Sequence, residues 1–332
     1  MFRWCFWCAV LMYLTSCQSH SGTTQTLKPN EDVLQKGVVS GPVTLAPNET
    51  FRFFLPSSYS DSLALPVVIF FDPHADGALP IQRYQTIAED RQWILIGSDY
   101  ASNEQSTENN LRHASALIQA VKARFHPSLI QLAGFSGGAK VALMAAATDP
   151  KVSAVVYAGA AEPIQPTHPL QLLGIAGQRD MNYPEVVLYH YSLPASFQHQ
   201  LLVWGGKHEW PAPEVMVNAF RPLSSIEPDK LAHITNEEKS FLEKESVIHQ
   251  QLAFAFQEKD LNWWKGTIAR LQSDSLNAVS VRTLGFLSLA GYSLTNRAIR
   301  ENQPALARQF LQIYQMADPQ NPDVARLAAQ LH

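Results

Sequence analysis

The stretch Gly134-Phe135-Ser136-Gly137-Gly138 fits the pattern Gly-X-Ser-X-Gly and lies between two different kinds of segment. A β-rich apolar run over residues 128–133 precedes it, and a run of small residues typical of a helix follows it over 138–148. A sharp turn from strand to helix needs little side-chain bulk at Gly134 and Gly138, where the two elements approach closely. The stretch therefore predicts a turn that exposes the Ser136 hydroxyl above a sheet. A glycine-rich connection with an incidental serine would show the same pattern. Whether Ser136 is a nucleophile therefore depends on finding an acid and a base that could act with it.

Short apolar runs alternate with amphipathic ones on both sides of this stretch, from residue 43 to residue 225. The expected strands are 49–56, 65–72, 93–97, 128–133, 152–158, 170–176 and 200–204, and the expected helices include 81–91, 108–125 and 138–148. A β-α-β rhythm of this kind is typical of a mostly parallel, doubly wound sheet with helices on both faces. We therefore predict an α/β domain over residues 43–225.

A serine hydroxyl is a poor nucleophile until a base removes its proton. In a sheet of this type the chain order is serine, acid, histidine, and the last two follow late strands. Asp180 follows the strand expected at 170–176, and His208 follows the one at 200–204. Because parallel strands bring their carboxyl ends to one edge, both side chains should lie beside Ser136. We predict Asp180 as the acid and His208 as the base.

Other residues fit these roles less well among the eleven histidines of the chain. His74 precedes the serine, His190 lies in an expected helix, and His199 sits just before the last strand, at its wrong end. Glu185 could replace Asp180, but it too lies in an expected helix.

Acyl transfer also needs N–H donors for the oxygen that becomes negative. The N–H of Gly137 is placed for this by the turn, and the start of the following helix adds a favourable dipole. A second donor is expected from residues 72–77, after the strand at 65–72. Pro73 has no N–H, so His74 is the first choice, through its backbone, and Ala75 the second. The His74 ring could instead contact the substrate.

The pattern changes after residue 225, since residues 226–332 contain helix formers and no strand candidate. Thr235 and Glu238 fit a capping box at a helix start. Residues 296–316, with the proline-rich turn 318–322, resemble one tetratricopeptide-like helix pair, for which no second copy is found. A helical cap packed on the sheet is the alternative. This region is also where a protein partner would bind.

Composition excludes several classes of function. The 332 residues are 46% hydrophobic, carry a net charge of −4, and contain no block of lysine or arginine, so no nucleic-acid partner is expected. The three cysteines, Cys5, Cys8 and Cys17, all lie at the start. The rest of the chain therefore has no disulfide, thiolate metal site or cysteine nucleophile. We expect no metal and no cofactor.

The first residues predict the compartment. Arg3 is followed by an apolar run, 5–14, which is long enough for a signal peptide and short for a membrane span. Leu14-Thr15-Ser16-Cys17 resembles a bacterial lipobox. This resemblance implies a signal peptide over residues 1–16 and a lipid on Cys17, with residues 17–42 as a flexible tether. An ordinary cleaved signal is the alternative. The expected location is the bacterial cell envelope, on the outer membrane and facing the periplasm or the surface.

Residues 51–221 resemble α/β hydrolases of the feruloyl esterase, polyhydroxybutyrate depolymerase and dienelactone hydrolase kind. The matching features are the strand into His74, the turn at Ser136, Asp180, and the segment 206–211 around His208. The resemblance implies hydrolysis of an ester or amide through an acyl-enzyme. One departure is that Asp72-Pro73 replaces the usual His-Gly.

The expected function is therefore that of a serine hydrolase acting on an ester, either a small molecule or one linked to a glycan or polyester. Two other classes stay open. One is a catalytically inactive hydrolase fold that serves as a binding or assembly lipoprotein, and the other is a serine peptidase with the same residues. The fold alone does not decide among them.

Overall fold

The computed structural model describes residues 35–194, 198–221 and 234–331. The predicted signal peptide, Cys17 and most of the expected tether lie outside these residues. At the end of the tether segment, Gly37 and Ser40 donate backbone hydrogen bonds to the carbonyls of Leu55 and Phe53, so this part pairs with a strand. The described residues belong to one compact unit.

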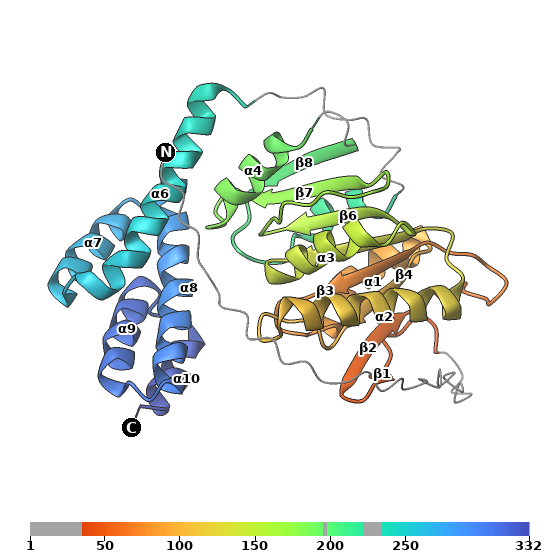
Figure 1. Ribbon diagram of the computed structural model, residues 1–332, viewed down its shortest axis with the longest axis horizontal. Coiled ribbons are helices and arrows are strands. Elements are labelled where there is room, and N and C mark those ends of the chain that lie inside the picture. Colours follow the sequence, from red (N-terminus) through yellow and green to blue (C-terminus); the bar gives the residue numbers. More distant parts are fainter. Residues whose placement is uncertain (1–34, 195–197, 222–233, 332) are drawn as a thin grey trace, which may run out of the picture. The chain divides into compact units, whose positions relative to one another are not determined.

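Within the described residues, eight strands form one sheet in the order β1-β2-β4-β3-β5-β6-β7-β8 (Figure 1). They are β1 Val43–Ala46, β2 Glu49–Phe54, β3 Val67–Phe71, β4 Ile94–Ser98, β5 Ile130–Phe135, β6 Val152–Ala158, β7 Gln171–Gly177 and β8 Gln198–Trp204. β2 runs antiparallel to β1 and β4, and the strands from β3 to β8 are parallel. The predicted mostly parallel α/β sheet is thus confirmed.

Helices cover both faces of the sheet. They are α1 Ala78–Arg91, α2 Thr107–Phe125, α3 Gly137–Thr148, α4 Tyr183–Ser192 and α5 Pro213–Met216, which is followed by the short 3-10 helix η1 Val217–Ala219. α2 and α3 lie in front of the sheet in Figure 1. Val68 and Phe70 of β3 pack with Tyr84 of α1 and with Phe220, which follows η1.

β3 is buried along its whole length, as its continuous apolar run predicts. Burying a Val, Ile or Phe side chain contributes about 1.5–3 kcal/mol. β3 and its neighbours are therefore a rigid base for the loops that follow their carboxyl ends.

The part of 234–331 that the structure describes is helical and contains no strand, as expected. Its helices are α6 Asn236–Glu258, α7 Leu261–Ser273, α8 Ala278–Arg300, α9 Pro304–Ala317 and α10 Pro322–Ala329. The capping box of Thr235 and Glu238 at the start of α6 is confirmed. The helix pair expected over 296–316 begins earlier than the sequence suggested, because residues 296–300 are the last turn of the 23-residue helix α8.

Arg282, a buried residue of α8, connects the helical region to the α/β region. Arg282 of α8 donates to both carboxylate oxygens of Glu245, at 2.6 Å each, and its third nitrogen donates to the Gln178 carbonyl at 2.7 Å. Its guanidinium also lies over the ring of Tyr183, 5.0 Å from the centroid. The ion pair thus joins α8 to α6 and compensates the buried Arg282 charge. The bond to the Gln178 carbonyl joins α8 to the loop after β7.

Two features are absent from the described ranges. No group of three or more His, Cys, Asp or Glu side chains there has an arrangement that could hold a metal ion. None of the helices in those ranges is both long and apolar enough to cross a bilayer.

Candidate active site

Ser136 lies at the turn between β5 and α3 with φ 52° and ψ −124°. Positive φ is uncommon for a residue other than glycine and costs energy, so the surroundings must hold it. The Ser136 N–H donates to the carbonyl of Ala158 at 2.8 Å. A Cβ at Gly134 would lie 2.1 Å from the Gly138 carbonyl oxygen, so only glycine allows the strand and helix to approach this closely. The predicted strand-turn-helix unit is present.

The structure brings the three predicted residues together in one hydrogen-bonded row. Nε2 of His208 lies 3.1 Å from Oγ of Ser136, and Nδ1 of His208 lies 2.8 Å from Oδ1 of Asp180. Asp180 is 2% exposed, whereas the His208 side chain keeps 23% of its surface exposed. The carboxylate is therefore shielded from water, while the serine–histidine end is open to a substrate.

Asp180 is oriented by the turn after β7. Its own N–H donates to the Gly177 carbonyl at 3.0 Å, and its Oδ1 also accepts from the N–H of Asn182 at 2.8 Å. Gln178, which precedes it by two residues, accepts the hydrogen bond from Arg282 of α8. The helical region thus supports the loop that carries Asp180.

His208 is held by the aromatic residues around it. Its ring lies 4.7 Å from the ring of Phe135, centroid to centroid. Two residues further on, Nε1 of Trp210 donates to Oδ2 of Asp72 at 2.7 Å. The Pro211 carbonyl accepts from the hydroxyl of Tyr84 at 2.7 Å. These contacts fix the His208 loop to β3 and α1.

Asp72 ties the loop after β3 together. It is 2% exposed, its Oδ1 accepts from the His74 N–H at 2.8 Å, and its backbone carbonyl accepts from the Ala75 N–H at 3.2 Å. Both N–H groups expected as the second donor therefore already have acceptors on Asp72. The Gly137 N–H, at the first position of α3, has no acceptor among the described residues. The His74 side chain is exposed.

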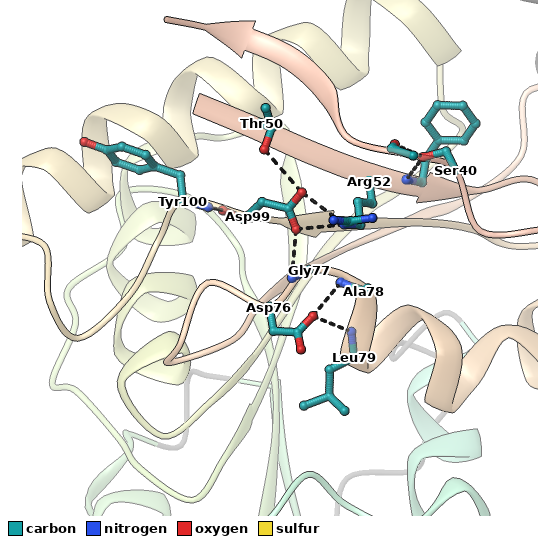
Figure 2. A network of polar contacts seen from close by, with 12 residues as sticks. Ser40, Thr50, Arg52, Asp76, Gly77, Ala78, Leu79, Asp99 and Tyr100 are labelled. Atoms are coloured by element: carbon teal, nitrogen blue, oxygen red, sulfur yellow. Dashed lines mark hydrogen bonds and ion pairs between the residues drawn. The ribbon is translucent and has the colours of Figure 1, made fainter. Parts of the chain in front are cut away.

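Figure 2 shows how the far end of this loop is fixed. The Asp99 carboxylate, just after β4, accepts from the Gly77 N–H at 3.1 Å, from Nε of Arg52 at 3.2 Å and from the Thr50 hydroxyl at 3.3 Å. Asp76 accepts at 3.1 Å from each of the first two N–H groups of α1. The loop over residues 72–77 is thus anchored at both ends.

The alternative acid and bases lie in other environments. Glu185 accepts from the Ala161 N–H at 2.9 Å and lies 3.6 Å from Nζ of Lys140. His190 is 2% exposed, and burial lowers its pKa to about 4, helped by the nearby His199. His199 lies within β8 and not before it, because that strand begins two residues earlier than expected.

The structure contains a second serine–histidine–carboxylate set, which the sequence did not indicate. Oγ of Ser98 lies 2.9 Å from Nε2 of His113, and Nδ1 of His113 lies 2.9 Å from Oε2 of Glu49. All three residues are buried. Burial lowers the pKa of His113, and the Glu49 carboxylate opposes this shift. No local motif surrounds these residues, and it is the pairing of β2 with β4 that brings Glu49 close to Ser98.

No protein-family model and no curated protein matches the sequence. Similar solved structures include Est1E from Butyrivibrio proteoclasticus with ferulic acid bound, at 13% identity and a TM-score of 0.44, over 55% of this chain and 96% of that one. An S-formylglutathione hydrolase from Staphylococcus aureus has 14% identity and a TM-score of 0.44, over 55% and 98%. A serine hydrolase without a lid from Xanthomonas campestris has 19% identity and a TM-score of 0.38, over 48% and 80%. These likenesses concern the fold alone.

Proposed function

We propose that this chain is a serine hydrolase that cleaves carboxylic esters through an acyl-enzyme. The observation that carries the proposal is the row from Ser136 through His208 to Asp180, with the serine on a strained turn and its histidine partly exposed. A nucleophile, a base within hydrogen-bond reach and a carboxylate that orients the base are the parts that acyl transfer requires.

In the first step, Nε2 of His208 takes the proton of Ser136 while Oγ attacks the ester carbonyl carbon. The carbonyl oxygen becomes negative and accepts the Gly137 N–H. When the tetrahedral intermediate collapses, the C–O bond to the alcohol breaks, and His208 returns the proton to the departing oxygen. The alcohol leaves, and the acyl group stays on Ser136.

A water molecule then releases the acyl group through the same two stages, attack and collapse. His208 takes a proton from a water molecule, whose oxygen attacks the acyl carbon, and the Ser136 oxygen leaves with that proton. The acid product is released, and the serine is restored. Asp180 holds the proton on Nδ1 throughout and stabilises the imidazolium that forms in each step.

The substrate class we propose is an ester of a small molecule, or an ester linked to a glycan or polyester. It is tested by comparing p-nitrophenyl acetate, methyl ferulate and an acetylated sugar with peptide p-nitroanilides, using the wild type and Ser136→Ala. We expect turnover of at least one ester, faster than that of any amide and lost in the variant. Faster cleavage of amides would indicate a peptidase. An inactive wild type would indicate a binding protein.

We also propose that the enzyme is anchored to the cell envelope by a lipid on Cys17. The support is the lipobox-like sequence that ends at this residue. Mass spectrometry of the mature N-terminus should find a modified Cys17 as the first residue. A Cys17→Ala protein that is still cleaved at the same site and bound to membranes would contradict the anchor.

A further inference from the structure

The proposed reaction leaves one chemical requirement unfilled. Acyl-transfer sites usually direct two donors at the developing oxyanion, and the Gly137 N–H is one of them. The N–H groups of His74 and Ala75 are held by Asp72, which is buried and is itself bound by Trp210. To free the His74 N–H, the loop would have to give up a charge-assisted hydrogen bond to a buried carboxylate. The second donor should therefore come from another segment.

The loop between β4 and α2 lies beside these residues. The Asn103 N–H donates to the Pro73 carbonyl at 2.9 Å, and the neighbouring Ser102 forms an isolated antiparallel bridge with His74. Asn103 thus lies alongside the position from which the second donor was expected. Asp99, at the start of this loop, also binds Gly77, so the two loops are fixed to each other.

The Asn103 carboxamide contacts the residue that follows the nucleophile. A Cβ placed on Gly137 would lie 1.7 Å from Oδ1 of Asn103, 2.9 Å from its Cγ and 3.5 Å from its Nδ2. The carboxamide therefore occupies the space beside the Gly137 Cα, next to the N–H that serves as the first donor. Asn103 is exposed, and its carboxamide has no hydrogen-bond partner within the described ranges.

A half-turn of the amide exchanges its oxygen and nitrogen, which have nearly the same shape. In this orientation Nδ2 takes the place of Oδ1, and its N–H groups are available to a ligand. A neutral amide suits this place because it donates without requiring a counter-ion. Asparagine side chains are among the groups that stabilise oxyanions in acyl transfer.

We propose that Asn103 is a catalytic residue whose Nδ2 donates the second hydrogen bond to the oxyanion formed on attack by Ser136. This role rests on the proposed function. It also explains why position 137 is glycine, since any side chain there would displace the carboxamide.

The test compares Asn103→Ala and Asn103→Asp with Glu104→Gln, a matched control at an exposed residue of the same loop. For an ester that the wild type cleaves, Asn103→Ala should lower kcat by about 10²–10³-fold, while KM changes by less than about threefold. Asn103→Asp should lose at least as much, because a carboxylate repels the oxyanion. The control should keep wild-type kcat.

A second readout separates catalysis from loop structure. A trifluoromethyl ketone adds to Ser136 and forms a stable oxyanion, so its affinity should fall by about the same factor as kcat. If the wild type is active and the kcat of Asn103→Ala stays within threefold of that of the control, Asn103 is not the second donor. The proposed function would still stand in that case. The role would also be overturned if KM rose while kcat and ketone affinity stayed unchanged. A wild type that cleaves no ester would contradict the proposed function itself, and this role with it.

Discussion

The molecule contains two serine–histidine–carboxylate sets with nearly the same distances. In the first, Ser136 and His208 are 3.1 Å apart, and His208 lies 2.8 Å from Asp180. In the second, which we call the buried set, Ser98, His113 and Glu49 are joined by two contacts of 2.9 Å. Residue types and spacing therefore do not distinguish a candidate catalytic site from a structural network.

The surroundings of the two serines do distinguish them. Oγ of Ser98 accepts from the N–H groups of Tyr100 at 3.2 Å and Ala101 at 3.0 Å, which occupy both of its lone pairs. An oxygen without a free lone pair cannot attack a carbonyl carbon, and Ser98 is also fully buried. Ser136 lies instead on a turn with positive φ. What makes a serine a candidate nucleophile here is an open lone pair at an accessible turn.

The largest expected effect is the loss of activity when a residue of the first set is replaced. Ser136→Ala and His208→Ala should each lower turnover by about 10⁴–10⁶-fold, and the double variant should be little worse, because the residues act as a unit. Steady-state kinetics with an ester of the proposed class measures this. Losses that multiply in the double variant would show independent roles.

A smaller loss is expected for the acid. Asp180→Asn should lower kcat by about 10⁴-fold, since the imidazole keeps its place but loses its charge partner and correct tautomer. Glu185→Gln is the matched control, because Glu185 bonds to a backbone N–H and lies near Lys140 instead. Full activity in Asp180→Asn together with an inactive Glu185→Gln would show that Glu185, and not Asp180, is the acid that orients His208.

Buried histidines outside the row of Ser136, His208 and Asp180 should make the free energy of unfolding depend on pH. His190 has a folded pKa of about 4 against 6.5 for the free side chain, so below pH 6.5 the unfolded chain binds a proton that the folded chain does not. The free energy of unfolding should therefore fall as pH decreases from 6.5 to 4, by up to about 3 kcal/mol from this residue. Urea unfolding across this range should show a smaller fall in His190→Leu. An identical fall in the free energy of unfolding of wild type and variant would contradict the lowered pKa of His190.

The smallest expected effect concerns Ser98 of the buried set, which should matter for stability and not for activity. Ser98→Ala should reduce the free energy of unfolding by about 1–3 kcal/mol, because His113 and two backbone N–H groups lose their partner in the interior. The kcat of the folded protein should stay within a few-fold of wild type. Chemical denaturation and kinetics on one preparation measure both quantities. A loss of kcat as large as that of Ser136→Ala would give the buried set a catalytic part.

The contrast also explains what the sequence could predict. The turn at Ser136 was predictable because Gly134 and Gly138, on either side of it, indicate a close approach of strand and helix. Asp180 and His208 were predictable because each follows a recognisable late strand of a parallel sheet. The buried set was not, because Glu49, Ser98 and His113 lie far apart in the chain and carry no turn signal.

Other features depend on contacts between distant loops. The bond from Trp210 to Asp72 and the contact of Asn103 with Gly137 each join segments that only the folded sheet brings together. β1, Val43–Ala46, was missed because it is short and only partly buried, so it lacks the apolar run of a central strand. The start of α8 was missed because its cap at Asn277, which accepts from the Val279 N–H, has no capping-box partner to mark it.

The most direct test of the account is to find which serine reacts. The folded wild-type protein is treated with a fluorophosphonate, digested, and examined by mass spectrometry for the labelled peptide. We predict a label on Ser136, none on Ser98, and loss of labelling in His208→Ala, because the hydroxyl then has no base. A label on Ser98, or no label on Ser136 in the folded protein, would contradict the account.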